Sequence, residues 1–299
     1  MEFDVIVIGG SYAGLAAATP LARARRRVLV VDGGMRRNRY AEHSHGFLTQ
    51  DGTPAAEIAA IGRAQLLRYP TVSWYEKNVT HAQKIEGGFA ITVDGLPTQT
   101  ARRLVLATGV VDRLPDIAGL AERWGQHVFH CPYCHGYELN QGRIGLLASS
   151  AQAMHLAQLL PDWGPTTLLL NDTFEPDELQ RDALRRRGVT VERGLVDHIE
   201  NAMDVVMKDG RTLTFEGLFA MTSPYCAGSL ATLLGCAFEE GPMGRTIRTD
   251  ALKATTVPGV YACGDAARPG GSVPLAVGDG SLAGAAAHQS LIFAPHLDR

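Results

Sequence analysis

The segment of this sequence best suited to chemistry is Cys131-Pro132-Tyr133-Cys134-His135-Gly136-Tyr137-Glu138. Two cysteines at positions i and i+3 fall within one helical turn, close enough to form a disulfide, and in a cytosolic protein such a pair is usually redox-active. If the turn opens a helix, the helix amides would also stabilise a thiolate. We therefore interpret Cys131 and Cys134 as a redox-active dithiol.

A zinc site and an inert structural pair are the two alternatives for these cysteines. Zinc could use Cys131 and Cys134 together with a nearby histidine, for which the candidates are His127, His130 and His135. A zinc site normally needs four ligands in two spaced pairs, and the sequence contains no second Cys-x-x-Cys. We therefore expect no metal.

Composition narrows the possible class of protein. The chain has 299 residues, enough for about two domains, and its formal net charge of -3 favours neither nucleic acid nor an anionic membrane as a partner. Strand-like residues begin at Phe3, and no apolar run is long enough to span a membrane, so we expect a cytoplasmic protein. Three further cysteines lie singly among apolar or small residues and are expected to be unreactive: Cys226, Cys236 and Cys263.

The first forty residues have the pattern of a dinucleotide-binding unit. An apolar strand over 5–8 leads into Gly9-Gly10-Ser11-Tyr12-Ala13-Gly14, then a small-residue helix, then a strand over 28–31 that ends on Asp32. This order brings a pyrophosphate to a helix N-terminus and a ribose to a carboxylate. The fingerprint is imperfect because Ser11 replaces its middle glycine. The candidate cofactor contacts here are Gly9, Gly10, Ser11, Ala13, Gly14 and Asp32.

A polar loop over 36–51, centred on His43-Ser44-His45-Gly46, follows this unit. Loops in this place often line a ligand, although a solvated surface loop is the alternative. We select Arg37, Asn38 and His45 from it as candidate cofactor contacts.

The next segment completes the first domain. A helix is expected over 54–67 and strands over 72–75, 89–93 and 103–107, with Asp94-Gly95 as a hairpin turn. The last strand ends in Ala107-Thr108-Gly109, where Thr108 and Gly109 are further cofactor candidates. Leu114-Pro115 marks the expected crossing to a second domain.

The chain then repeats its opening pattern with altered residues. Strands are expected over 143–147, 166–170, 189–192, 204–207 and 218–221, with a helix over 149–160 and a hairpin turn at Asp209-Gly210. The phosphate loop reads Ala148-Ser149-Ser150 where glycines are expected. The segment 171–175 after the second strand contains no Arg or Lys for a ribose phosphate, although Asp172 could hold an unphosphorylated ribose.

Near Asp250 we expect the chain to return to the first domain. A strand over 259–263 ends in Gly264-Asp265, ahead of a small-residue helix over 278–289. Gly264 and Asp265 complete the list of candidate cofactor contacts.

In the order of these motifs, nearly the whole chain resembles the low-molecular-weight thioredoxin reductase family of flavoproteins. Cys-x-x-Cys-His-Gly-Tyr-Glu is most similar to the dithiol oxidases of gliotoxin and holomycin biosynthesis. The resemblance implies an α/β fold of two Rossmann-like, three-layer dinucleotide-binding domains, the second inserted in the first. Residues 1–114 and 248–299 would bind FAD, and 115–247 would form a nicotinamide-binding-like domain with the dithiol. It also implies a homodimer, with Gly9, Gly14 and Asp32 at the ADP half of FAD and Asp265 near its ribityl or pyrophosphate region.

Two departures from ordinary thioredoxin reductases favour the oxidase branch. His135 stands where those enzymes have an aspartate, and a histidine with a pKa near 6.5 can take a proton from a substrate thiol at neutral pH. His130 could share this role. The alternative is that His135 only satisfies a buried hydrogen bond. The second departure is the altered nucleotide fingerprint, which disfavours NADPH.

These observations predict an FAD-dependent oxidase that converts a small-molecule dithiol to its disulfide through Cys131 and Cys134. A substrate thiolate would attack Cys131, the second substrate thiol would release the product, and the electrons would pass from Cys134 through the flavin to oxygen, giving hydrogen peroxide. Two alternatives remain open: a disulfide reductase that uses NADH, NADPH or another donor, and a non-catalytic flavin-binding sensor.

Overall fold

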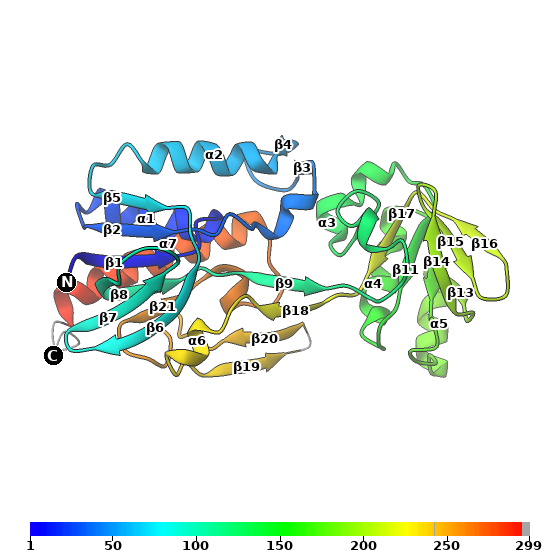
Figure 1. Cartoon of the computed structure of the whole chain (residues 1–299). Coiled ribbons are helices and arrows are strands. Elements are labelled where there is room, and N and C mark those ends of the chain that lie inside the picture. The colour runs from blue at the N-terminus through cyan, green and yellow to red at the C-terminus, as the bar shows by residue number, and fades with distance from the viewer. Residues whose placement is uncertain (242, 295–299) are drawn as a thin grey trace. The chain divides into compact units, whose positions relative to one another are not determined.

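The computed structural model describes residues 1–241 and 243–294 (Figure 1). The chain forms two compact units. The first unit comprises Met1–Arg39, Pro54–Val111 and the chain from Pro224 onward, and the second comprises Tyr40–Thr53 and Asp112–Ser223. The strands β9 (Val110–Arg113) and β18 (Ser223–Cys226) lie where the chain passes between the units, and they pair with each other (Figure 1).

The first unit is built around a seven-stranded sheet in the order β5-β2-β1-β8-β7-β6, in which β21 also pairs with β8. The strands β1, β2, β5, β8 and β21 run parallel to one another, and β6 and β7 add an antiparallel edge. Strands buried on both faces read as continuous apolar runs, as β2 and residues 5–8 of β1 do. The strands are β1 (Phe3–Ile8), β2 (Val28–Val31), β5 (Val72–Tyr75), β6 (Val79–Ile85), β7 (Gly88–Val93), β8 (Gln99–Leu106) and β21 (Val260–Ala262).

The helices α1 and α7 of the first unit pack against each other at backbone distance. A Cβ atom built on Gly280 or Gly284 of α7 would lie 2.1 Å from the carbonyl oxygen of Ala13 or Ala17 on α1, so only glycine fits there. This packing holds the first turn of α1 in place. The helices and smaller elements are α1 (Tyr12–Arg23), η1 (Arg37–Tyr40), α2 (Ala55–Leu66), α6 (Leu230–Leu233), β19 (Phe238–Gly241), β20 (Gly244–Ile247), η5 (Gly264–Ala267) and α7 (Val273–Phe293).

The second unit contains a five-stranded sheet in the order β10-β17-β11-β12-β13, with every pair parallel. A separate antiparallel sheet is formed by β14, β15 and β16. The strands are β3 (His43–Ser44), β4 (Thr53–Pro54), β10 (Val128–Phe129), β11 (Ile144–Leu147), β12 (Thr166–Leu169), β13 (Thr190–Glu192), β14 (Val196–Glu200), β15 (Asp204–Met207), β16 (Thr212–Thr214) and β17 (Gly217–Ala220). The helices are η2 (Ala121–Arg123), α3 (Pro132–His135), η3 (Tyr137–Leu139), α4 (Ala153–Leu159), η4 (Leu160–Asp162) and α5 (Glu178–Arg186).

The α/β class and the two Rossmann-like domains are confirmed, but the domain boundaries differ from the expected 114/115 and 247/248. The first unit resumes at Pro224, because Leu230, Cys236 and Ile247 are buried in its core. Residues 40–53 pack with the second unit although they were expected in the first. The expected range 248–299 also includes residues 295–299, which lie outside the described chain.

No helix within residues 1–241 and 243–294 combines the length and the apolar character that a membrane span requires.

Candidate functional site

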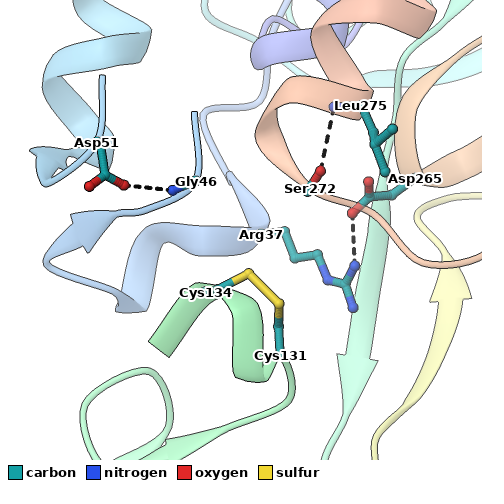
Figure 2. The surroundings of a disulfide bond; sticks show 8 residues. All are labelled: Arg37, Gly46, Asp51, Cys131, Cys134, Asp265, Ser272 and Leu275. Carbon is teal, nitrogen blue, oxygen red and sulfur yellow. Dashed lines mark hydrogen bonds and ion pairs between the residues drawn. A yellow bond between two sulfur atoms is a disulfide. The ribbon is translucent and has the colours of Figure 1, made fainter. Parts of the chain in front are cut away.

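Cys131 and Cys134 are joined in a disulfide, with their Cα atoms 5.3 Å apart (Figure 2). The pair stands at the start of α3: Cys131 is the extended residue before the helix, and Pro132 occupies its first turn, where a missing backbone N–H costs nothing. The spacing predicted that the two cysteines lie close enough for a disulfide, and the helix start that the sequence left as a condition is present in the structure. In the described part of the chain, no group of three or more His, Cys, Asp or Glu side chains is arranged to hold a metal ion.

The imidazole of His135 lies at the end of the same short helix. It stacks on Phe129 of β10, with ring centroids 4.5 Å apart and an angle of 20° between the ring planes. Burial, and to a lesser extent the neighbouring His45, lower the pKa of His135 to about 4. This is below the ordinary value near 6.5 that the residue type suggested. His135 is consequently neutral at physiological pH, so its lone pair is free to accept a proton, and the same lowering of the pKa makes it a weaker base than an ordinary histidine.

His45 belongs to the loop that packs with the second unit. Its Nε2 lies 3.5 Å from Oε1 of Glu138, and its Nδ1 lies 3.6 Å from Oδ1 of Asp51. Asp51 is itself held by the backbone N–H of Gly46, which donates to Oδ1 at 2.7 Å (Figure 2). We expected His45 among the cofactor contacts, and that stays a prediction; the structure places it beside the dithiol segment. No local signal predicts this, because Glu138 is distant in sequence.

Aromatic rings surround the remaining candidates of this segment. His130 stacks on Trp124, with centroids 5.7 Å apart, and Tyr133 meets Trp163 edge to face at 5.3 Å. Tyr133 and Tyr137 are exposed on either side of Cys134 and His135 in the chain. These two tyrosines were not selected from the sequence, although exposed aromatic side chains beside a redox pair are natural contacts for a substrate.

The glycine turn of the first unit forms a tight cradle between β1 and α1. Gly9 has φ +101°, and a Cβ atom on it would lie 2.2 Å from the carbonyl oxygen of Ala107. A Cβ atom on Gly14 would lie 1.8 Å from the carbonyl oxygen of Gly9. Ser11 has φ −83°, a conformation open to any residue, which explains why the imperfect fingerprint still folds as a turn.

Asp32, at the end of β2, is tied to this turn. Its Oδ1 accepts a hydrogen bond of 3.1 Å from the backbone N–H of Gly10. A Cβ atom on Gly10 would lie 2.7 Å from Cβ of Asp32 and 2.4 Å from the ring of Trp74. The turn, the start of α1 and a carboxylate therefore form one structural group, as the dinucleotide pattern predicted, and Trp74 is a member that the pattern did not reveal.

The other candidates of the first unit follow the ends of neighbouring strands. Nη1 of Arg37 lies 2.8 Å from Oδ2 of Asp265 (Figure 2). Asp265 follows Gly264 in η5, shortly after the end of the strand β21. Asn38 donates from Nδ2 to the hydroxyl of Tyr12 at 3.1 Å, and that hydroxyl donates to a backbone carbonyl. Gly264 has φ +66°, and a Cβ atom there would lie 2.8 Å from Cβ of Ala13.

Thr108 and Gly109 directly follow the strand β8. Gly109 has φ +66°, and its carbonyl oxygen accepts a hydrogen bond of 3.1 Å from the N–H of Ala227. Because β1, β2, β8 and β21 are parallel neighbours, the segments after their carboxyl ends lie at one edge of the sheet, where dinucleotides bind in folds of this type.

The corresponding edge of the second unit is built differently. After β11 the chain continues through Ala148-Ser149-Ser150, and α4 begins only at Ala153. Asn171, after β12, uses its Oδ1 to accept a hydrogen bond of 2.9 Å from the N–H of Val196. The segment 171–175 itself contains no Arg or Lys, but in the folded chain Arg181 and Arg193 reach Glu175 from other elements.

The three cysteines outside the disulfide carry no sign of reactivity. Burial raises the pKa of the Cys263 thiol to about 12, and it also raises the pKa of Cys226 and of Cys236. Cys236 and Cys263 are buried, whereas Cys226 is half-buried. All three are protonated thiols at neutral pH, as their apolar surroundings predicted.

Comparison with known proteins places these features in context. Residues 3–280 match the pyridine nucleotide-disulphide oxidoreductase family. Thioredoxin reductase tcpT of Claviceps purpurea is 30% identical over 97% of this chain and 94% of its own. The crystal structure of an oxidoreductase from Agrobacterium tumefaciens superposes with a TM-score of 0.96 at 56% identity, covering 98% of this chain and 99% of that one. The crystal structure of HlmI has a TM-score of 0.90 at 36% identity, covering 97% and 92%.

Proposed function

Because this chain belongs to the pyridine nucleotide-disulphide oxidoreductase family of flavoproteins, we propose that it is an FAD-dependent dithiol oxidase. The substrate is a small molecule with two thiols, the product is its disulfide, and oxygen is the final acceptor. Two hydrogens leave the substrate and appear in hydrogen peroxide, so the reaction is balanced without a nicotinamide. We also propose that the protein acts as a homodimer.

The observation that carries this proposal is the Cys131–Cys134 disulfide with a neutral histidine directly after it. A disulfide is the oxidised form that a substrate thiolate attacks. A neutral imidazole can accept the proton that each substrate thiol must lose, whereas an imidazolium cannot. The arrangement therefore suits the oxidation of thiols, and the resemblance to the dithiol oxidases of gliotoxin and holomycin biosynthesis supports it.

The exchange on the protein proceeds in two attacks. The first substrate sulfur bonds to Sγ of Cys131, the Cys131–Cys134 bond breaks, and Cys134 leaves as a thiolate. The second substrate sulfur then attacks the first, Cys131 leaves, and the product departs as a cyclic or linear disulfide. His135 accepts a thiol proton at its imidazole nitrogen in these steps. Two electrons now reside on the Cys131/Cys134 dithiol.

The first unit has the features that an FAD would need. The cradle of Gly9, Gly10 and Gly14 lets backbone amides approach a pyrophosphate, because any Cβ atom there would fill the space. Asp32 would hold the ribose of the ADP half, and the Arg37–Asp265 pair would lie near the remainder of the cofactor. When bound, FAD supplies the two-electron chemistry that reoxidises the dithiol and reduces oxygen.

A disulfide reductase is the second candidate function, and two observations favour it. The second unit keeps the all-parallel sheet of a nucleotide-binding domain, and the relative tcpT is called a thioredoxin reductase. The residues of the expected nucleotide site argue against it, because Ala148-Ser149-Ser150 adds side chains where glycines would let the backbone approach a pyrophosphate.

Anaerobic absorbance spectra of the flavin separate the two candidates. Under nitrogen, a vicinal dithiol such as dithiothreitol should bleach the flavin band, and admitted air should restore it with release of hydrogen peroxide. Millimolar NADPH should leave the band unchanged, and NADH should act slowly at most. Rapid bleaching by NADPH would instead identify a reductase, and a protein that cannot be loaded with FAD would defeat both candidates.

A further inference from the structure

Three charged side chains meet beside the second nucleotide-binding-type sheet. Glu175 stands in the loop between β12 and α5, Arg181 lies on α5, and Arg193 follows β13. Oε1 of Glu175 is 2.9 Å from Nη2 of Arg193 and 3.4 Å from Nη1 of Arg181, and Oε2 is 3.3 Å from Nε of Arg193. One carboxylate therefore receives donors from two guanidinium groups.

The triad formed by Glu175, Arg181 and Arg193 lies beside the ends of the strands β12 and β13. The strands β11, β12 and β13 are parallel neighbours, so the segments after their carboxyl ends share one edge of the sheet. In dinucleotide-binding sheets, the end of the strand next to the phosphate-loop strand carries an acid for the ribose hydroxyls or an arginine for a ribose 2′-phosphate. Here β12 is that strand, and both arginines are bound to a carboxylate of the same chain.

We propose that Glu175 is a specificity-determining residue that occupies, with its own carboxylate, an arginine pair otherwise suited to a ribose 2′-phosphate. A phosphate monoester and a carboxylate accept the same N–H donors of guanidinium groups. A 2′-phosphate must displace Glu175 and then remain beside its negative charge, so the native chain disfavours adenine nucleotides that carry a ribose 2′-phosphate. This inference concerns the ligand of the second unit and does not depend on dithiol oxidation.

The charge state of the triad is consistent with this role. Hydrogen bonds from Arg193 lower the pKa of Glu175, so its carboxylate is ionised at neutral pH, and the same interaction raises the pKa of Arg193. The side chains of Glu175 and Arg193 are exposed, so a soluble ligand can reach them. Replacing Glu175 by a neutral residue leaves two positive charges in its place.

Other carboxylates share this edge and limit the size of the effect. Asp172 lies in the same loop and is exposed, and Glu178 opens the helix α5. Asp177 is engaged as the N-cap of α5, where its Oδ1 accepts a hydrogen bond of 2.8 Å from the N–H of Gln180. Glu175 differs from them because it alone of these four has hydrogen bonds to both Arg181 and Arg193 within the described chain.

The test is nucleotide binding to the FAD-loaded protein, measured by titration calorimetry at low salt. The probes are adenosine 2′,5′-bisphosphate, which has a 2′-phosphate, and adenosine 5′-monophosphate, which lacks one. Glu175→Gln should bind the bisphosphate on the order of tenfold more tightly than the native chain does, the range expected for charge-assisted hydrogen bonds at an exposed site. Binding of the monophosphate should be unchanged.

Asp182→Asn provides a matched control. Like Glu175→Gln, it removes one negative charge and frees an arginine, because Asp182 of α5 pairs with Arg185 on the exposed surface. It should not tighten the bisphosphate. The proposal is overturned if Glu175→Gln binds the bisphosphate no better than the native chain, if it tightens both nucleotides equally, or if Asp182→Asn gives the same gain. Each of these outcomes is independent of whether the protein oxidises dithiols.

Discussion

Nε2 of His45 lies 3.5 Å from Oε1 of Glu138, so the loop over Tyr40–Thr53 is connected to the segment that carries the disulfide. The two residues are members of one charged group, because Asp51 lies on the other side of the imidazole. His45 in turn contributes to the low pKa of His135. A residue far from the dithiol in sequence therefore tunes the histidine beside it.

We predict that His45→Ala raises the pKa of His135. His45 is the second cause of the lowered value, and burial is the first, so the new pKa should rise above about 4 and stay below 6.5. Chemical shifts of the His135 ring protons over pH 3–8 measure it directly. His155→Ala, which removes an exposed histidine of α4, is the control and should leave the titration unchanged. A lower or unchanged pKa of His135 in His45→Ala would contradict this account.

His135→Ala should reduce the rate of dithiol oxidation by roughly 100-fold or more, the usual contribution of a positioned base. In the native protein this group remains neutral down to a pH of about 4. Its contribution to the rate should therefore be constant from pH 8 to pH 5 and fall only as the pH drops further and the imidazole becomes protonated. Steady-state peroxide release measured from pH 8 down to pH 3 gives both results, because the loss through protonation of His135 occurs only below about pH 5. As controls, His127→Ala should have little effect on the rate, and His130→Ala should lower the rate less than His135→Ala does. A native-like pH profile of the rate in His135→Ala would remove the residue from the mechanism.

Cys131→Ser and Cys134→Ser should each abolish dithiol oxidation while the protein keeps its flavin. Each variant lacks one sulfur of the disulfide that the substrate attacks. Apart from His45, the candidate flavin contacts lie in the first unit, so loss of activity should not be accompanied by loss of colour. Cys226→Ser is the control, because the raised pKa of Cys226 keeps it a protonated thiol at neutral pH. Substantial turnover by both disulfide variants would show that the dithiol is not used.

Two glycines of α7 should respond oppositely to the same substitution. Gly280→Ala places a Cβ atom 2.1 Å from the backbone oxygen of Ala13, so α1 and α7 must separate, at a cost of about 1–3 kcal/mol. Gly278→Ala meets no atom within 4 Å, and it should stabilise the helix by roughly 0.5–1 kcal/mol. Chemical denaturation of the two FAD-loaded variants checks the prediction, which fails if both shift the free energy of unfolding in the same direction.

The sequence predicted the features that depend on local chemistry. Apolar runs and turn residues located the strands β2, β5 and β15 at their observed bounds, and the ordered motifs predicted the family and its two Rossmann-like domains. The spacing of Cys131 and Cys134 was enough to predict that they lie close together, since residues at i and i+3 are neighbours in any helical turn. The backbone conformation at Gly9 likewise follows from its place in the fingerprint.

Features that depend on tertiary contacts could not be read in this way. The first unit resumes at Pro224 because Leu230 and Ile247 are buried in its core. An apolar residue type does not indicate which of two hydrophobic cores the side chain belongs to. The pKa of His135 is set by burial and by His45, so the residue type suggested too high a value. Arg181 and Arg193 were missed because they reach Glu175 from elements other than its own loop.

The last prediction concerns the candidate FAD site. In Asp32→Asn the side chain keeps its shape and can still accept the hydrogen bond from the N–H of Gly10, so the glycine turn should remain folded. The variant loses the negative charge that would receive the ribose hydroxyls of the cofactor, and a hydrogen bond to a charged acceptor contributes about 1.5–3 kcal/mol. FAD should therefore bind roughly 10- to 100-fold more weakly, measured by the recovery of flavin fluorescence on release. Glu57→Gln, which removes an exposed carboxylate from α2, is the matched control and should bind FAD as the native protein does. Equal affinity of Asp32→Asn and the native chain would show that Asp32 supports the turn without contacting the cofactor.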